Sequence, residues 1–182
     1  MTEVLDDDAR ARLYLEHREA IEERAALRNE GRELIEAALF TLEEPLAALA
    51  SQHGAELYVA TEDLRPSLTL YRPSWMSAQG LLVSVGLGWE RRRLLVPGPY
   101  NEWAWTGVWV ADDTFRRREA LLGVLKKLRA PYGFSTSSGW SLWRYASPGT
   151  GELNPDAYAQ EVLRQVEAVW AVTRDVIDQA LT

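Results

Sequence analysis

Few of the residue types that carry out chemistry are present in this 182-residue chain. It contains no cysteine and only two histidines, which excludes disulfides, cysteine-ligated zinc, thiol catalysis and a histidine-rich metal site. His17 has no second histidine four positions later, so the HExxH zinc motif is absent. His53 falls at an expected helix end, where capping is its expected role. We therefore predict no catalytic residue, no metal ligand and no cofactor.

Two loops have the composition of a nucleophile or phosphate site without the required context. Ser137 and Ser138 lie in a glycine-bounded turn that leads into a strand, whereas a nucleophile elbow leads into a helix. Gly86 and Gly88 lie inside an expected strand, and no Gly-Lys-Ser/Thr motif follows them. Adjacent acids such as Glu43–Glu44 do not share a helix face. An enzyme with an unrecognised, scattered site remains an alternative.

Tryptophan is the least ordinary feature of the composition, with eight residues. Trp103, Trp105 and Trp109 share one face of an expected strand, and Val108 and Val110 lie on the other. These rings either fill a core between sheet and helices or form a one-sided docking or stacking surface. If the helices cover the valine-bearing face, the tryptophan face needs another partner.

Charge is distributed unevenly along the chain, whose net charge is −7. Segment 91–144 holds ten basic and four acidic residues, a local charge of +6 within an acidic frame. The acidic total disfavours nonspecific nucleic-acid binding, and charge runs usually pair or are solvated. The expected interaction surface combines the basic residues with the tryptophans: Arg91, Arg92, Arg93, Trp103, Trp105, Trp109 and Arg144.

A helical segment is expected over residues 1–54. Asp6, Asp7 and Asp8 suit a helix start, because carboxylates favour the positive end of the helix dipole. Pro45 is expected to kink or restart the helix, and Gly54 to end it. Apolar residues recur every seven positions, with a one-step shift midway, at Leu13, Ala20, Leu27 and Leu34 and then at Ile35, Leu42 and Leu49.

Residues 55–182 are expected to form a sheet-and-helix core, packed with the helical segment into a single α+β domain over 1–182. Short connections predict a mainly antiparallel, tryptophan-rich sheet of about five to seven strands. Helices are expected near 113–129, ended by Pro131, and over 155–181, where Asn154-Pro155 is a start signal. The strands are expected at 57–60, 68–71, 81–89, 93–96 and 103–110, with two more within 132–146.

The helical run from Leu13 to Leu42, followed by LYRPSW, LLVSVGLGW and WTGVWVA, resembles the C-terminal half of some PD-(D/E)xK-type nuclease-fold proteins of prokaryotic defence systems. That family's chemistry needs an Asp and a (Glu/Asp)-x-Lys around a divalent metal. Here the residues two before Lys126 and Lys127 are Val124 and Leu125, so the catalytic motif is absent. The resemblance implies a noncatalytic relative or partner.

These patterns favour a non-enzymatic interaction subunit with an accessory, regulatory or inhibitory role, in a prokaryotic or phage-defence setting. Its expected partner is another protein, or a second copy bound through the N-terminal helix or the sheet face. The alternative is a nucleic-acid-binding module that uses segment 91–144. No apolar run approaches the roughly 18 residues of a membrane span, and the acidic N-terminus is unlike a secretory signal, which predicts a cytoplasmic protein.

Overall fold

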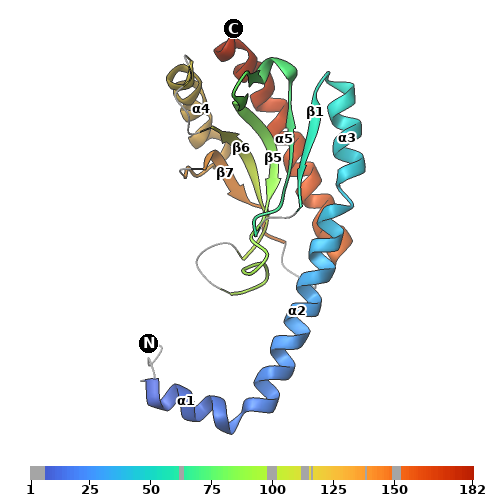
Figure 1. Cartoon of the computed structure of the whole chain (residues 1–182), viewed down its shortest axis with the longest axis vertical. Helices are drawn as coiled ribbons and strands as arrows, with labels where there is room; N and C mark the ends of the chain where they lie inside the picture. Colours follow the sequence, from blue (N-terminus) through green and yellow to red (C-terminus); the bar gives the residue numbers. More distant parts are fainter. Residues whose placement is uncertain are drawn as a thin grey trace.

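A five-stranded antiparallel sheet lies at the centre of the molecule, in the order β1-β2-β5-β6-β7 (Figure 1). Each strand pairs with its neighbour in antiparallel register, as the short connections predict. The computed structural model describes residues 7–61, 64–97, 102–111, 115, 117–137, 139–148 and 153–182. The five strands are β1 (Glu56–Ala60), β2 (Ser67–Tyr71), β5 (Val83–Gly88), β6 (Trp105–Val110) and β7 (Trp140–Tyr145).

The expected strand over 81–89 is shorter than predicted. β5 begins at Val83, and Leu81 belongs to a separate small hairpin of β3 (Met76–Ser77) and β4 (Gly80–Leu81). Gly80 has a φ of 129°, a value that favours glycine and lets the chain turn tightly. Leu82 then donates its N–H to the carbonyl of Trp75, so the chain changes direction before β5 starts.

Two further strand predictions were wrong. Residues 91–95 form turns, because the N–H groups of Arg93 and Leu94 both donate to the carbonyl of Glu90. Leu95 has a φ of 62°, which breaks any extended run. The 132–146 segment contains one strand, β7, and only an isolated bridge joins Ser135 to Trp143.

The long, kinked N-terminal helical segment is confirmed. It consists of α1 (Asp7–Glu16), α2 (Arg18–Phe40) and α3 (Glu43–Gln52), and the stretch from Arg18 to residue 52 is bent by 25°. Pro45 lies in the first turn of α3, where a missing N–H is tolerated, whereas Gly31 continues α2 without a break. Gly54 has a φ of 61° and ends the segment.

Two more helices complete the fold. α4 (Arg118–Tyr132) ends at Gly133, whose φ is 67°, so Pro131 lies within the last turn instead of ending the helix. α5 (Pro155–Leu181) starts as predicted, with Asn154 accepting a hydrogen bond of 2.9 Å from the N–H of Ala157. Asp6, one of the acids expected at the start of the N-terminal helix, lies outside the described residues.

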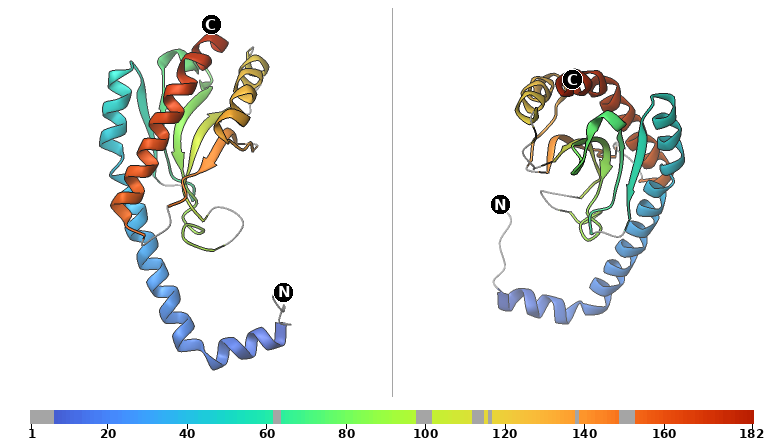
Figure 2. Two further views of the ribbon diagram at one scale, coloured as in Figure 1. Left: turned by 180° about the vertical axis from the view of Figure 1, so that it is seen from behind. Right: turned by 45° about the horizontal axis from the view of Figure 1, so that its top comes forward.

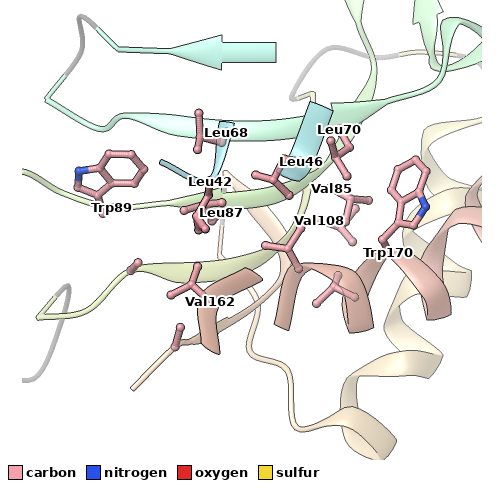
Figure 3. Packing of buried hydrophobic residues seen from close by; sticks show 14 of the residues in the cluster. Leu42, Leu46, Leu68, Leu70, Val85, Leu87, Trp89, Val108, Val162 and Trp170 are labelled. Carbon is pink, nitrogen blue, oxygen red and sulfur yellow. The ribbon is translucent and has the colours of Figure 1, made fainter. Parts of the chain in front are cut away.

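One face of the sheet is covered by α3 over β1 and β2, by α5 over β5 and β6 and by α4 beside β7, and α2 packs against α5 (Figure 2, left). Every second residue along β2, β5 and β6 faces this helical layer, because side chains alternate between the two faces of a strand. The strand residues that face the layer are fully buried. Figure 3 shows how helix and strand side chains interlock there; the set includes Leu42, Leu46, Leu68, Leu70, Val85, Leu87, Val108, Val162 and Trp170.

The N-terminal part of the helical segment projects away from this body (Figures 1 and 2). We call α1 and α2 up to Leu34 the arm. Leu15, Leu27 and Leu34 are 71%, 59% and 61% exposed, and burial begins only at Ile35. The seven-residue apolar pattern therefore lies in solvent along the arm and enters the core only in the last turns of α2.

Candidate functional site: an aromatic groove on the open sheet face

The face of the sheet opposite α3 and α5 forms a groove of about 920 Å³. It crosses the whole sheet, because its lining comes from β1, β2, β5, β6 and β7, with the β3–β4 hairpin, Ser137 and Gly139 at its sides. Seven of the sixteen lining residues are aromatic: Tyr58, Tyr71, Trp105, Trp109, Trp140, Trp143 and Tyr145.

Small residues form the floor of the groove. A Cβ on Gly86 would lie 2.1 Å from the carbonyl oxygen of Leu68, and one on Gly107 would lie 2.0 Å from that of Leu142. Only glycine allows the neighbouring strands to approach this closely. Thr69 and Ser84, both buried, complete the floor next to these glycines. The aromatic side chains therefore surround a floor of small residues.

The aromatic rings are held in edge-on contacts. The indole of Trp105 lies over Gly88, where a Cβ would be 3.0 Å from the ring, and meets Trp140 edge-on at a centroid distance of 6.2 Å. Trp143 and Tyr145 form a second edge-on pair at 4.9 Å. Such geometries are favourable for aromatic pairs and preorganise the walls.

The electrostatic character of the groove is nearly neutral. Among the described residues that line it, Arg65 carries the only charge, and its guanidinium lies 3.6 Å from the carboxylate of Glu90. The hydroxyl of the lining residue Tyr71 donates a 2.5 Å hydrogen bond to Glu56, which is outside the lining, and this bond raises the pKa of that tyrosine. The described lining includes no Asp, Glu, His or Lys that could serve its serine hydroxyls as a general base.

Two buried donors in the groove walls lack acceptors. The indole Nε1 atoms of Trp105 and Trp143 are covered and have no hydrogen-bond partner within the described chain. Trp105 is only 9% exposed. A buried donor without an acceptor is unfavourable by about 1–3 kcal/mol.

The structure brings together two of the three tryptophans of the expected interaction surface. Trp105 and Trp109 line the groove. Trp103 precedes β6 and packs instead on the ring of Tyr158 from α5, at a centroid distance of 5.9 Å. The expectation that all three share one strand face was wrong for Trp103, because the strand starts two residues after it.

The basic residues of that surface lie elsewhere. Arg91 forms an ion pair of 2.5 Å with Glu36 of α2, and Arg93 lies 3.6 Å from Glu90, while Arg92 is exposed. Arg144 alternates with Trp143 and Tyr145 along β7, so it lies on the other side of the strand. Its guanidinium lies 5.4 Å from the ring of Phe134. Tryptophans and arginines therefore do not form one continuous surface.

Sequence reasoning missed most of the groove. Trp143 and Tyr145 alternate with the buried Leu142, which is the same signal that identified Trp105 and Trp109. Trp140 also lines the groove, because the β6–β7 register shifts between Val108 and Trp109 and pairs Trp140 with Trp109. No sequence pattern predicts this shift. Tyr58 and Tyr71 are placed beside them by the pairing of β1 with β2.

Other candidate sites are sparse in the part of the chain that the structure describes. No three His, Asp or Glu side chains gather there in a way that could hold a metal ion. His53 is the C-cap residue of α3, and its ring nitrogens lie 3.0 and 3.1 Å from Nη1 of Arg174. None of the helices described has the length and apolar character that a membrane span requires.

Comparison with protein families, with curated proteins and with solved structures found no match to this chain. The resemblance to PD-(D/E)xK-type defence proteins therefore stays a prediction.

Proposed function

We propose that this protein is a non-enzymatic interaction subunit that holds a segment of a partner protein in the aromatic groove. The observation that carries the proposal is the gathering of seven aromatic side chains on the sheet face that none of the described helices covers. Trp109, Trp140 and Trp143 are each only partly buried although they sit on central and edge strands. Aromatic residues in a preformed concavity are the usual anchors of protein interfaces.

Covering the groove removes a large apolar area from water. Each tryptophan or tyrosine side chain presents about 150–250 Å² when fully exposed, and burial is favourable by about 25 cal/mol per Å². Because the rings already pack edge-on against one another, little rotamer freedom is lost when a partner binds.

The geometry gives less support to the two alternatives. A nucleic-acid surface needs free cations beside the stacking rings, whereas Arg91 and Arg93 face carboxylates and Arg144 lies on the other side of β7. An enzyme needs groups that move protons at the reacting centre, and the groove offers hydroxyls without an adjacent base. A role of this protein in prokaryotic or phage defence is supported only by the resemblance to PD-(D/E)xK-type proteins.

The arm gives the proposal a second contact surface. The leucines of its apolar stripe are exposed in the described chain, and helices in proteins take most of their stability from packing an apolar face against another surface. Self-association through the arm is therefore part of the proposal. Light scattering on the wild type and on Leu27→Glu tests it, because a charge in the apolar stripe would lower the mass of an arm-mediated oligomer.

The test of the groove is an affinity capture from a lysate of the native host, with and without nuclease, read by mass spectrometry. Three baits are compared: the wild type, Trp109→Ala/Trp140→Ala in the groove, and Tyr132→Ala as a control. Tyr132 is 43% exposed on α4 and does not line the groove. We expect a stoichiometric protein that survives nuclease and is lost only with the groove variant. A partner that is retained by the groove variant, or that disappears with nuclease, would overturn the proposal.

A further inference from the structure

The arm carries an apolar stripe along one side of α2. Ala20, Leu27 and Leu34 recur every seven residues, and all three are exposed. Beyond them the repeat moves by one position to Ile35 and Leu42, which are buried in the core. One residue corresponds to about 100° around a helix, so the apolar direction turns where α2 meets the body. The stripe of the arm therefore faces a different direction from the one that its own body buries.

Charged residues border this stripe with opposite signs on its two sides. A strict seven-residue spacing is typical of a helix that pairs with another helix, and Leu27 then takes position d of the heptad. Glu23 and Glu30 take position g on one edge, and Arg28 takes position e on the other edge. Arg24, at the adjoining position a, adds a second cation on the basic side. All four charged side chains are exposed.

Within a single arm these charges repel one another. Residues three or four positions apart are neighbours on a helix surface, and between residues 19 and 34 all such charged neighbours have the same sign. The pairs are Glu19–Glu22, Glu19–Glu23, Arg24–Arg28, Arg28–Arg32 and Glu30–Glu33, and opposite charges at this spacing come only at the ends of the span, as Arg18–Glu22 and Arg32–Glu36. Like charges so placed destabilise an isolated helix, and opposite charges on a second helix would compensate them.

The order of the two edges selects the occupant and its orientation. In a parallel pair of helices the g edge of each faces the e edge of the other, whereas in an antiparallel pair g faces g and e faces e. A second arm lying parallel sets Glu23 of each copy beside Arg28 of the other. An antiparallel second arm would set acid against acid and base against base. The charges of the stripe are therefore complementary to a parallel copy of the same arm.

The attachment of the arm to the body compensates for its short length. The part of α2 in the arm, residues 18–34, is about 25 Å long, which is marginal for an isolated helix. α2 continues without a break into the core, where Ile35, Ala38 and Leu39 are buried, so the helix is already nucleated. The arm also projects away from the body, which leaves the stripe accessible (Figures 1 and 2).

We infer that the arm pairs with the arm of a second copy as a parallel two-stranded coiled coil. Leu27 and Leu34 of the two copies pack in the seam, and Glu23 of each copy forms an ion pair with Arg28 of the other. The two bodies then lie at the same end of the paired arms. This rests on the self-association included in the proposed function and specifies its partner, its orientation and its contacts.

Sedimentation equilibrium of the full chain tests the pairing. We expect the wild type to dimerise with a Kd below about 100 μM. Glu23→Arg and Arg28→Glu should each weaken dimerisation about tenfold, because each replaces two attractions by two repulsions. The double variant Glu23→Arg/Arg28→Glu should return to within about twofold of the wild type, since the opposite charges then face each other again. Glu33→Arg, at position c and away from both edges, is the matched control and should leave the Kd unchanged.

A single introduced cysteine tests the orientation, because the chain has none of its own. Ala20→Cys places a thiol in the seam, where a parallel pair brings the two thiols face to face, and oxidised glutathione should link them into a covalent dimer. An antiparallel pair places Ala20 near Leu34 of the other copy, too far for a disulfide, which needs Cα atoms within about 7 Å. Asn29→Cys, on the opposite side of the helix, is the control and should stay unlinked under the same oxidation.

Four results would overturn the inference: a wild type that is monomeric at about 100 μM, a dimer that survives Leu27→Glu, a single charge reversal that strengthens association, or equal cross-linking of Ala20→Cys and Asn29→Cys. If the arms fail to pair while the groove variant still loses its host partner, the inference is wrong and the groove part of the proposed function stands. If the arms pair while no groove-dependent partner is captured, the inference stands and the groove part fails.

Discussion

The two faces of the sheet are built from the same strands and have opposite characters. On the covered face, β2, β5 and β6 present leucine and valine side chains that are fully buried under α3 and α5 (Figure 3). On the open face the alternate residues are glycine, serine, threonine and large aromatics. Most of the aromatic side chains there remain at least partly exposed, among them Trp109, Trp143 and Tyr145, whereas Trp105 is buried.

This difference reflects the demands on each face. Aliphatic side chains interdigitate with helices and need no polar partner, so they suit a face that stays dry. The rings of tryptophan and tyrosine carry one polar atom, so they suit a surface that is exposed to water until a partner binds. These rings are also rigid when they are exposed. The open face therefore has the properties that the proposed interface requires. Six variants, grouped in four predictions, test this contrast, from the largest expected effect to the smallest.

The largest expected effect is the difference in stability between removing a tryptophan under the covered face and removing one from the groove. Trp170→Ala removes a ring that is 1% exposed and packs against Trp75 at 5.4 Å, so unfolding free energy should fall by about 3–5 kcal/mol. Trp109→Ala, in the groove, should lower it by only about 1 kcal/mol, because that side chain is only partly buried. Urea unfolding followed by circular dichroism measures both. Equal losses would mean that the open face is also core.

The glycine floor should tolerate no side chain. Gly107→Ala should lower the unfolding free energy by about 3 kcal/mol, because the new Cβ would lie 2.0 Å from the Leu142 carbonyl oxygen and a backbone must move. Gly123→Ala is the matched control in α4, where a Cβ meets nothing within 4 Å. It should raise stability by about 0.5–1 kcal/mol through helix propensity. A harmless Gly107→Ala would show that the strands can separate there.

On the covered face, Tyr158 ties α5 to the start of β6. Its hydroxyl accepts the N–H of Ala104 at 3.0 Å, and burial raises the pKa of Tyr158 well above its usual value of 10.0. Tyr158→Phe leaves that N–H without a partner and should lower stability by about 1–2 kcal/mol at neutral pH.

The same tyrosine has a pH signature. Because its folded pKa is raised, its stabilising contribution is complete below pH 10 and is lost as pH rises above that value. Unfolding curves between pH 8 and pH 11 should therefore fall less steeply with pH in Tyr158→Phe than in the wild type. Parallel curves would show that this hydroxyl ionises as easily in the folded chain as in the unfolded one.

The smallest effect is expected at the solvent edge of α5. Hydrogen bonds from Arg164 and Gln165 lower the pKa of Glu161 to about 2. Because the folded pKa is lowered, this contribution is present above the unfolded value of 4.5 and is lost as pH falls toward 2. Solvent screens the pair, so Glu161→Gln should lower stability at pH 7 by no more than about 0.5 kcal/mol. Thermal unfolding should show a larger difference between Glu161→Gln and the wild type at pH 7 than at pH 3, and no difference below pH 2.

Much of the architecture could be predicted from local patterns. The helix start at Asn154-Pro155, the restart at Pro45 and the antiparallel pairing of short, alternating strands all follow from signals within a few residues. The failures lie where local pattern and tertiary contacts disagree. Residues 93–96 look like a strand, but Leu94 is buried by turning toward the core, and Leu95 takes a left-handed φ next to α2.

The candidate site could be predicted only in part. Alternation around Val108 correctly separated Trp105 and Trp109 from the valine face. It could not show that segment 91–93 turns toward α2, where Glu36 pairs with Arg91, or that Arg144 lies on the other side of β7 from the tryptophans. Charge pairing depends on distances between residues far apart in the chain, and composition contains no such distances.

The sequence alone determined the identity of each strand face, since alternation is a local property of an extended backbone. It also determined which chemistries lack their residues, through the absence of cysteine and the scarcity of histidine. Only the tertiary structure decided which face α3 and α5 would cover, and that β1, β2, β6 and β7 would bring seven aromatic rings around one glycine floor. The physical reason is that register and layer order arise from contacts between distant segments, whose free energy depends on shape and burial in three dimensions.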